Sequence, residues 1–370
     1  MKKQEDKKII VVQRIIPSYR IDFFRLLDKS LKEDFQVWYS SNPEKNKIFK
    51  TKKTSIKFFR NLGHCYSFLG SFWQFGVIFI PIKRNDIIIL EGNPRIITNF
   101  FLILRCYFKR ANFVWWGHLY SSTSKNLRSK IRLKIMSFFS NILFYTDEEA
   151  KKYKKFKEVK NNIFYLNNGV DLEKLNPLRK SYDSSKREID IFFIGRFTKK
   201  SNINLLLKAL INDNCKNYTA ILIGAESDEE VIEYENILKL HYLTDRVTIK
   251  KVITDERDIA YFANRTKIFC YPGSVGLSLI HSMAYGLPSL IHDESKYHMP
   301  EFSAFKENFT GINFKYLDHN SLSKSISKIL EDENILKNFS QNSIQIVESK
   351  YNFIFMKNKF LEMIKQISQG

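Results

Sequence analysis

Compact apolar runs alternate with amphipathic segments along the whole chain. The segments between the runs repeat their apolar residues at helical spacing, as in residues 21–31 and 96–108. Runs of this kind are typical of strands that are buried on both faces of a parallel sheet. The alternation therefore predicts an α/β fold of parallel sheets covered by helices. The runs are residues 8–13, 35–39, 55–59, 86–91, 112–116, 141–146, 163–166, 189–195, 218–224, 246–251, 268–271 and 289–292.

One segment departs from the alternation. Residues 64–82 carry no Lys, Arg, Asp or Glu, are rich in Phe, and are nearly long enough to span a bilayer. Gly70, Gln74, Gly76 and Pro81 argue against a helix that faces lipid. We predict a buried helix here, with a helix lying in a membrane interface as the alternative.

A chain of 370 residues indicates two domains. Residues 176–186 are polar, include Pro177, and are predicted to link them. We place the first domain at residues 1–175 and the second at residues 176–345. The remaining segment, residues 346–370, contains an apolar-striped helix.

Residues 267–294 have the pattern of an anion-binding site. A short strand leads into a turn at Pro272-Gly273-Ser274, and Gly276 then opens a helix that ends at Gly286-Leu287-Pro288. A glycine-containing loop can approach phosphate closely, and a helix N-terminus favours negative charge. The alternative is one more strand–helix unit without a ligand.

Polar residues also follow other predicted strands, where open α/β sheets bind their ligands. Arg14, Tyr19 and Arg20 follow the first strand, His118 follows residues 112–116, and Arg196 follows residues 189–195. Tyr19 and Arg20 are equally compatible with helix-start packing and a surface charge. A structural role for His118 and a surface position for Arg196 are the corresponding alternatives.

These segments resemble the family 4 glycosyltransferases. The family's donor-sugar signature, P-S-x-x-E-G-F-G-L-x-x-x-E-A-M-A-x-G-x-P, is matched at Gly276-Leu277, Met283-Ala284, Gly286 and Pro288. Its two glutamates fall on Gly273 and His281. A related branch with G-L-S-x-x-H, which acts on bacterial surface polysaccharides, is more similar. Further matches are Q-R-x-x-P-x-Y-R at residues 13–20, W-G-H at 116–118, N-G-V-D at 168–171, and G-R with L-L-x-A at 195–209.

The resemblance implies the GT-B fold, with two Rossmann-like domains facing a cleft and a C-terminal helix packing back on the first domain. It implies that a sugar moves from a nucleotide diphosphate donor to a lipid-linked or polysaccharide acceptor. Anomeric configuration would be retained, without a metal and without a cofactor, because the nucleotide sugar is a substrate.

The resemblance also assigns roles to residues. His118 and Arg196 are the catalytic candidates, because they match the family's residues beside the donor sugar and diphosphate. The acceptor-side candidates are Arg14, Tyr19 and Arg20. Glu301 is proposed as a stand-in ribose ligand, with a helix N-terminal acid as the alternative. The donor-binding candidates are Gly195, Arg196, Lys200, Val252, Gly276, Leu277, His281 and Glu301.

Charge is distributed unevenly between the halves. Residues 1–175 contain 34 Lys and Arg against 15 Asp and Glu, a net charge of +19, whereas residues 176–370 contain 26 against 24. This indicates an anionic membrane surface or nucleic acid as a partner of the first half. No exposed aromatic platform or groove-entering motif supports nucleic acid, so we expect the membrane.

The remaining features bear on location and activity. Cys65, Cys106, Cys215 and Cys270 are scattered, which suits a reduced compartment, and residues 1–10 lack a secretory apolar segment. We therefore expect a cytoplasmic protein, peripheral on the inner face of the cell membrane. Because both family glutamates are replaced, a GT-B scaffold that has lost catalysis and serves as a binding subunit is the rival hypothesis.

Overall fold

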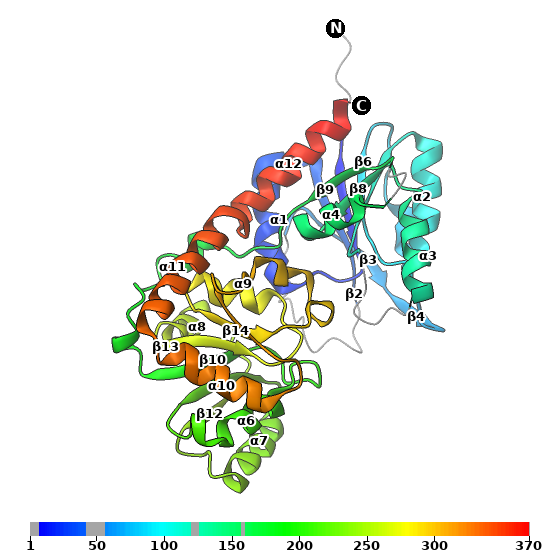
Figure 1. Ribbon diagram of the computed structural model, residues 1–370. Coiled ribbons are helices and arrows are strands. Elements are labelled where there is room, and N and C mark those ends of the chain that lie inside the picture. Colours follow the sequence, from blue (N-terminus) through cyan, green and yellow to red (C-terminus); the bar gives the residue numbers. More distant parts are fainter. Residues whose placement is uncertain (1–6, 42–55, 120–125, 157–159, 370) are drawn as a thin grey trace. The chain divides into compact units, whose positions relative to one another are not determined.

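The computed structural model describes the chain except for residues 1–6, 42–55, 120–125, 157–159 and 370 (Figure 1). It divides into two compact units. Unit 1 comprises Met1–Asn167 together with Phe353–Gly370, and unit 2 comprises Asn168–Asn352. The segment predicted as a linker, residues 176–186, lies inside unit 2.

Unit 1 is built on a parallel sheet with the strand order β3-β2-β1-β6-β7-β8-β9. A separate antiparallel hairpin, β4–β5, follows β3. The elements are β1 (Ile9–Gln13), α1 (Ser18–Leu31), η1 (Lys32–Asp34), β2 (Phe35–Ser41), β3 (Phe59–His64), β4 (Tyr66–Phe68), β5 (Ser71–Trp73), η2 (Phe75–Phe79), β6 (Ile87–Glu91), α2 (Thr98–Lys109), β7 (Asn112–Trp116), α3 (Asn126–Met136), β8 (Asn141–Phe144), α4 (Asp147–Lys154), β9 (Asn162–Tyr165) and α12 (Phe353–Gln369).

Successive residues of β1 enter two different cores, because side chains alternate across a strand. Ile9 and Val11 pack with α1 and α12, and Ile10 and Val12 pack with η2, α2, α3 and α4. Both faces of the sheet are therefore covered, which explains why its central strands β1 and β6 are almost entirely apolar. The C-terminal helix α12 runs beside α1 (Figure 1). The ring of Phe360 on α12 lies 6.4 Å from that of Phe23 on α1.

The prediction of a helix over residues 64–82 is wrong. This segment forms the end of β3, the β4–β5 hairpin and the short 3-10 helix η2. Gly70 lies in the hairpin turn with a φ of +74°, a conformation that few other residues adopt without strain. The glycines that argued against a lipid-facing helix therefore mark a turn.

Two other predictions fall partly on residues that the structure does not describe. The sequence also predicts a basic helix over residues 121–140. The structure describes α3, Asn126–Met136, within this range, whereas the first residues of the range lie in the undescribed segment 120–125. The basic run 151–160 includes the undescribed residues 157–159. The strand predicted at residues 55–59 lies further along the chain: β3 begins only at Phe59, the last residue of that range.

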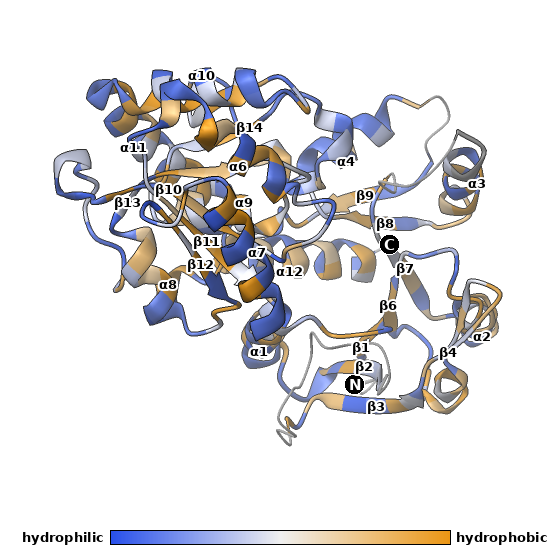
Figure 2. Ribbon diagram, turned by 90° about the horizontal axis from the view of Figure 1, so that it is seen from below, coloured by the Kyte–Doolittle hydropathy of each residue, from blue (hydrophilic) through white to orange (hydrophobic). Residues whose placement is uncertain are grey.

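Unit 2 has a second parallel sheet with the strand order β12-β11-β10-β13-β14-β15. Its strands are mostly hydrophobic, whereas α7 and α10 carry both hydrophilic and hydrophobic residues (Figure 2). The elements are α5 (Leu172–Leu175), η3 (Ser184–Lys186), β10 (Ile189–Ile194), α6 (Ile203–Ile211), η4 (Asp213–Cys215), β11 (Ala220–Ala225), α7 (Asp228–Leu240), β12 (Val247–Lys251), α8 (Glu256–Ala263), β13 (Thr266–Tyr271), α9 (Leu277–Ala284), β14 (Ser289–His292), η5 (Ser295–Tyr297), η6 (Pro300–Ala304), β15 (Gly311–Phe314), α10 (His319–Leu330) and α11 (Glu333–Lys350).

A buried histidine pair supports the loop between β13 and α9. His298 Nδ1 accepts a hydrogen bond from the Val275 N–H (3.2 Å), so its proton is on Nε2, which donates to the His292 carbonyl oxygen (2.9 Å). The two rings stack with centroids 3.8 Å apart. Burial lowers the pKa of both His292 and His298 to about 4. Both rings are therefore neutral at physiological pH, and a second proton on His298 would break the bond to the loop.

This pair makes stability depend on pH. The folded chain binds fewer protons than the unfolded chain between about pH 6.5 and about pH 4, so stability is complete above this range and is lost as pH falls through it. We expect each ring to contribute on the order of 2–3 kcal/mol to this loss. The His292→Asn/His298→Gln variant retains hydrogen-bonding groups but does not titrate, and its thermal midpoint should fall less on acidification. The control His241→Gln removes an exposed histidine of unit 2 and should leave the wild-type slope; an equal slope in all three proteins would contradict this account.

Candidate functional site

The strands of a parallel sheet end at one edge, and in unit 2 this edge collects most of the predicted donor residues. Gly195 and Arg196 follow β10, Val252 follows β12, and residues 272–276 follow β13. Because β10 and β13 are neighbouring strands, their loops lie side by side. Val252 follows β12, which is separated from β10 by β11. Its backbone N–H donates to the Ala225 carbonyl oxygen (2.9 Å).

The loops after β10 and β13 are in direct backbone contact. The Ser274 N–H donates to the Lys200 carbonyl oxygen over 2.8 Å. A Cβ added at Gly273 would overlap that same carbonyl oxygen. Position 273, where the family signature has its first glutamate, therefore accepts no side chain with this backbone.

The turn after β10, which carries the predicted donor residue Lys200, also contains a buried serine. Ser201 is buried, and its Oγ donates to the Thr198 carbonyl (2.6 Å) and accepts from the Thr198 N–H (2.9 Å). Ser201 thus closes the turn after β10. Lys199 and Lys200 are both exposed on this turn, so the predicted donor residue Lys200 lies at the surface beside Gly273.

Arg196 is exposed at the end of β10, and no carboxylate in the described part of the chain forms an ion pair with it. Gly195 beside it packs against the Tyr271 ring at the end of β13. Burial raises the pKa of Tyr271 to about 12, so this neighbour is neutral. The guanidinium therefore offers its donors to solvent at the edge where the loops meet.

The N-terminus of α9 completes this arrangement. Gly276 caps the helix and Leu277 is its first residue. The Cβ position of Gly276 lies 3.3 Å from the Met299 side chain and 3.9 Å from Glu301 Oε2. The other oxygen of the buried Glu301 accepts a hydrogen bond from Asn168 Nδ2 (2.8 Å). The predicted residue Glu301 is thus held beside the loop, and the N-G-V-D segment supplies its support.

His281 lies on α9 and forms a contact that the sequence did not reveal. Its Nε2 is 2.7 Å from Glu256 Oε1, which also accepts a hydrogen bond from the Tyr285 hydroxyl (2.6 Å). Burial acts to raise the pKa of Glu256, but hydrogen bonds from His281 and Tyr285 hold it below its ordinary value. An ionised carboxylate therefore lies next to the position where the family signature has its second glutamate.

Glu256 was missed because nothing local connects it with His281. It is the first residue of α8, and the sequence shows only an acid in the first turn of a helix. Only the arrangement of the sheet brings the start of α8 to α9.

The carboxyl edge of the sheet in unit 1 carries the acceptor-side candidates. The Arg14 guanidinium lies 4.1 Å above the Phe72 ring, and the backbone N–H of Arg14 donates to Glu91 Oε2 (2.8 Å). Tyr19 is 46% exposed. Arg20, which the alternative treated as a surface charge, is buried over the rings of Trp116 (4.7 Å) and Tyr145 (4.9 Å). The alternative in which Arg20 is a surface charge is therefore wrong.

His118 follows β7 and has a carboxylate partner. Its Nδ1 is 3.6 Å from Glu149 Oε1, and its ring lies 4.1 Å from the Tyr145 ring. Glu149 Oε1 also accepts from the Leu119 N–H (2.9 Å), which fixes the carboxylate at the N-terminus of α4. Since Nδ1 is buried and the imidazole is 32% exposed, Nε2 is the nitrogen available to a ligand.

Two residues near His118 were also missed. Glu149 was interpreted only as one of three acids that favour a helix start. Arg132 was interpreted only as part of a basic helix, but its Nη1 donates to the carbonyls of Gly92 (3.3 Å) and His118 (3.2 Å). Three consecutive acids, where a helix start needs fewer, were the one available signal for Glu149.

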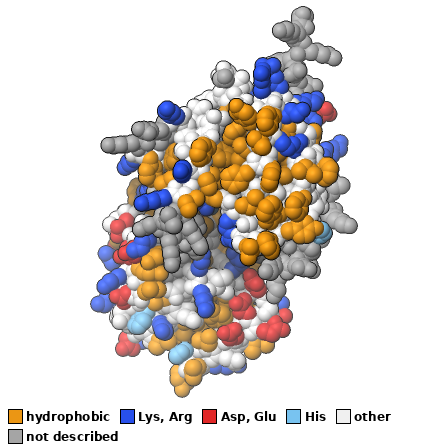
Figure 3. All heavy atoms as spheres, turned by 90° about the vertical axis from the view of Figure 1, so that its right-hand side faces the viewer, with side chains coloured by type: hydrophobic (Ala, Val, Ile, Leu, Met, Phe, Trp, Pro, Cys, Tyr) orange, Lys and Arg blue, Asp and Glu red, His pale blue; other side chains and the backbone are white. Residues whose placement is uncertain are grey.

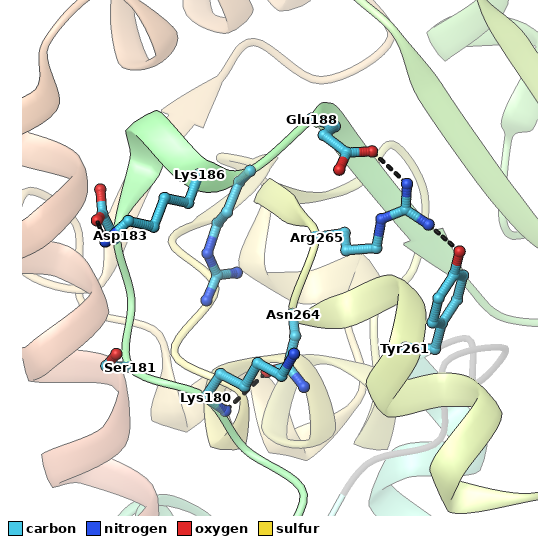
Figure 4. Close-up of a pocket in the computed structure, with 9 residues that line it drawn as sticks. Lys180, Ser181, Asp183, Lys186, Glu188, Tyr261, Asn264 and Arg265 are labelled. Atoms are coloured by element: carbon cyan, nitrogen blue, oxygen red, sulfur yellow. Dashed lines mark hydrogen bonds and ion pairs between the residues drawn. The ribbon is translucent and has the colours of Figure 1, made fainter.

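A cavity of about 420 Å³ lies at the opposite edge of the sheet in unit 2, at the amino ends of β10 and β13. In Figure 4, Arg265 reaches Glu188 on one side and Tyr261 on the other. Arg187 also lines the cavity, but its Nε and Nη2 are shielded from solvent and its guanidinium lies 4.2 Å above the Tyr182 ring. A ligand in the cavity would not reach these donors, so this cavity is not our candidate site.

The residues that the structure describes offer neither a candidate metal site nor a candidate membrane-spanning helix. They include no cluster of three or more His, Cys, Asp or Glu that could hold a metal ion. None of the helices in the described part of the chain combines the length and apolar character needed to cross a bilayer.

Sequence comparisons identify the family of the second unit. Residues 176–346 match the model of the glycosyl transferases group 1 family. An uncharacterized glycosyltransferase of Methanocaldococcus jannaschii is 21% identical over 87% of each chain. An uncharacterized 41.2 kDa protein of the cps region of Klebsiella pneumoniae is 26% identical, over 44% of each chain.

Structure comparisons cover nearly the whole chain. A glycosyltransferase from Rickettsia africae has a TM-score of 0.72 at 14% identity and covers 98% of both chains. Anabaena Alr3699/HepE, solved in complex with UDP, also has a TM-score of 0.72 at 14% identity, over 97% of this chain and 100% of that one. These likenesses confirm the predicted GT-B fold. Residues 176–346 thus match the glycosyl transferases group 1 family, and the chain as a whole has the GT-B fold.

Proposed function

We propose that this protein transfers a sugar from a nucleotide diphosphate donor to a lipid-linked or polysaccharide acceptor in the synthesis of cell-surface polysaccharide. The observation that carries the proposal is the contact of the loops after β10 and β13, which brings the turn that carries Arg196 against the loop that leads into α9. The UDP-bound Anabaena protein and the cps-region relative support the donor class and the setting. Family 4 membership, retention and independence of metal are parts of the same proposal, implied by the sequence resemblance.

The chemistry assigned to this site is stabilisation of the leaving diphosphate. When the glycosidic bond to the donor breaks, negative charge grows on the leaving phosphate oxygens. A planar guanidinium binds two such oxygens at once, and the amides at the start of α9 add a positive dipole end. The exposed lysines of the 197–201 turn are near enough to Gly273 to add to this field.

Glu256 is our candidate for the ribose ligand. The family signature places a carboxylate at position 281, and here His281 is hydrogen-bonded to a carboxylate that comes from α8 instead. Tyr285 and His281 both contact Oε1, so they fix the orientation of the carboxylate while keeping it ionised. An ionised oxygen is a strong acceptor for the two hydroxyls of a ribose. Glu301, held by Asn168, is the accompanying candidate on the other side of Gly276.

A second function, a binding subunit without catalysis, is favoured by one observation. Gly273 cannot carry the family's first glutamate without moving the backbone. Thermal stabilisation by a panel of nucleotide sugars, followed by assay of nucleotide diphosphate release, separates the two functions. Release identifies an enzyme, stabilisation without release identifies a binding subunit, and the absence of both would contradict the proposed donor class.

Arg196→Ala tests the diphosphate contact. Loss of a charge-assisted, bidentate interaction should weaken UDP or GDP binding by about tenfold or more. The thermal midpoint should not change, because Arg196 is exposed. Lys208→Ala removes an exposed charge from α6 of the same unit and is the matched control. Calorimetric affinities that are equal for wild type and Arg196→Ala would remove Arg196 from the site.

Glu256→Gln tests the ribose contact. Glutamine keeps an oxygen that accepts from Tyr285 but loses the charge. The variant should lose most of the preference of the wild type for UDP over 2′-deoxy-UDP, and its affinity for UDP should fall about tenfold. Asp258→Asn, which neutralises an exposed acid on the same helix, should retain the preference. If Glu256→Gln discriminates like the wild type while Glu301→Gln does not, the ribose ligand is Glu301.

His118→Ala tests the role of the unit 1 edge. A group that contacts the reacting sugar should affect turnover more than donor affinity, and we expect turnover to fall by about a hundredfold. Glu149→Gln should lower turnover to a smaller extent, because its carboxyl group positions the ring without contacting substrate. His64→Ala removes an exposed histidine of the same unit and serves as control. Wild-type kinetics in His118→Ala would make His118 structural.

A further inference from the structure

We infer that unit 1 docks on an anionic membrane through an apolar face formed by the β4–β5 hairpin, η2 and the outer side of α2. We call these elements the docking face. The inference rests on the proposed function, since a lipid-linked acceptor is reached at such a surface. It goes beyond that function because it names the surface that contacts the membrane. It also adds insertion of apolar side chains into the lipid to the electrostatic attraction between lysines and anionic lipid.

Helix α2 is apolar on both sides. Leu102 and Cys106 are fully buried in the core of unit 1. Five large apolar residues lie on the outer side with exposures between 42% and 74%. A helix that is apolar all round is normally buried, so this outer side is expected to have a partner. The five residues are Phe100, Phe101, Leu104, Tyr107 and Phe108.

The hairpin and η2 extend the same face. Phe72 of β5 forms a bridge with Ile96, just before α2, and Arg105 of α2 donates to the carbonyls of Val77 (2.7 Å) and Ile80 (2.9 Å). Figure 3 shows the hydrophobic side chains gathered in one area of unit 1, with Lys and Arg around it. Six more large apolar residues are exposed on these elements: Tyr66, Phe68, Leu69, Phe75, Ile78 and Phe79.

Charge complementarity indicates the partner. Residues 60–146 contain twelve Lys and Arg but only two acids, Asp86 and Glu91. Asp86 is fully buried, and Glu91 is partly buried and binds the Arg14 N–H. Residues 60–146 therefore contribute exposed cations but no exposed acid, and the cations include Lys83, Arg84, Lys109 and Arg110. Exposed aromatic and aliphatic groups with a cationic rim are the composition of surfaces that insert into anionic lipid interfaces.

A second copy of the chain does not fit this face equally well. In a twofold dimer the same patch meets itself, so the cationic rims would face each other and repel. Helix α2 has 12 residues and so extends about 18 Å, far less than the ~30 Å of a bilayer core. It therefore lies within the membrane surface and does not cross it.

Flotation of the full chain with vesicles tests the inference. Wild type should bind vesicles that contain phosphatidylglycerol, and raising salt from about 0.1 M to about 1 M should weaken binding without abolishing it, because apolar insertion is not screened. The Phe101→Ser/Leu104→Ser/Phe108→Ser variant should bind about tenfold less well or worse. The matched control, Ile232→Ser/Leu240→Ser/Tyr242→Ser, removes exposed apolar groups from unit 2 and should bind as wild type.

Further measurements keep failure of the inference distinct from failure of the proposed function. Thermal midpoints and nucleotide affinity should be the same for wild type and the Phe101/Leu104/Phe108 variant, since these side chains are exposed on unit 1. Undiminished vesicle binding by this variant, or no binding by wild type, overturns the docking face. A lipid-free wild-type dimer that the variant dissociates assigns the face to self-association and also overturns it. Vesicle binding without nucleotide binding would contradict the proposed function alone.

Discussion

The backbone contact between the loops after β10 and β13 governs the candidate donor site. It follows from the strand order, which makes β10 and β13 neighbours, so that Gly273 packs against the carbonyl of Lys200. The contact brings the turn that carries Arg196 against the loop that leads into α9, and on this arrangement we base the proposed diphosphate site. It also excludes a side chain at position 273. The same close packing that builds the phosphate side of the site thus removes one of the family's two carboxylates.

The carboxylates of this protein come from other elements. Glu256 reaches α9 from α8, Glu301 reaches Gly276 from η6, and Glu149 reaches His118 from α4. Each is fixed by a hydrogen-bond donor: Tyr285, Asn168 or the Leu119 N–H. A carboxylate that is fixed in this way keeps its direction, so the proposed site can take its carboxylates from positions other than those of the family signature.

Unit 1 combines two properties that are costly in water. It exposes a continuous set of large apolar side chains and concentrates positive charge around them. An apolar patch of this kind favours association, and like charges oppose association with an identical patch. An anionic lipid surface satisfies both properties at once. The proposed docking of unit 1 on such a surface would account for the asymmetry of charge between the two halves of the chain.

The sequence by itself determined the fold. The apolar runs at β1, β6 and β11 can be buried only as central parallel strands, and helical spacing between the runs leaves little freedom in the order of elements. It also placed Arg196, Gly276 and His118 at strand ends, because chain order fixes which residues follow a strand. The segment 64–82 was predicted wrongly, since a charge-free composition does not distinguish a helix from a hairpin with exposed aromatic residues.

Only the tertiary structure decided which side chains meet across elements. The pairing of Glu256 with His281 joins positions 25 residues apart, and that of His118 with Glu149 joins positions 31 apart, with no local pattern that links them. Burial of Arg20 between two aromatic rings and exposure of the outer side of α2 likewise depend on what packs against each residue. Local sequence sets the dihedral preferences of the backbone and the identity of the strands. Which side chains pair and which are exposed depends on how the strands and helices assemble, and no single segment encodes that assembly.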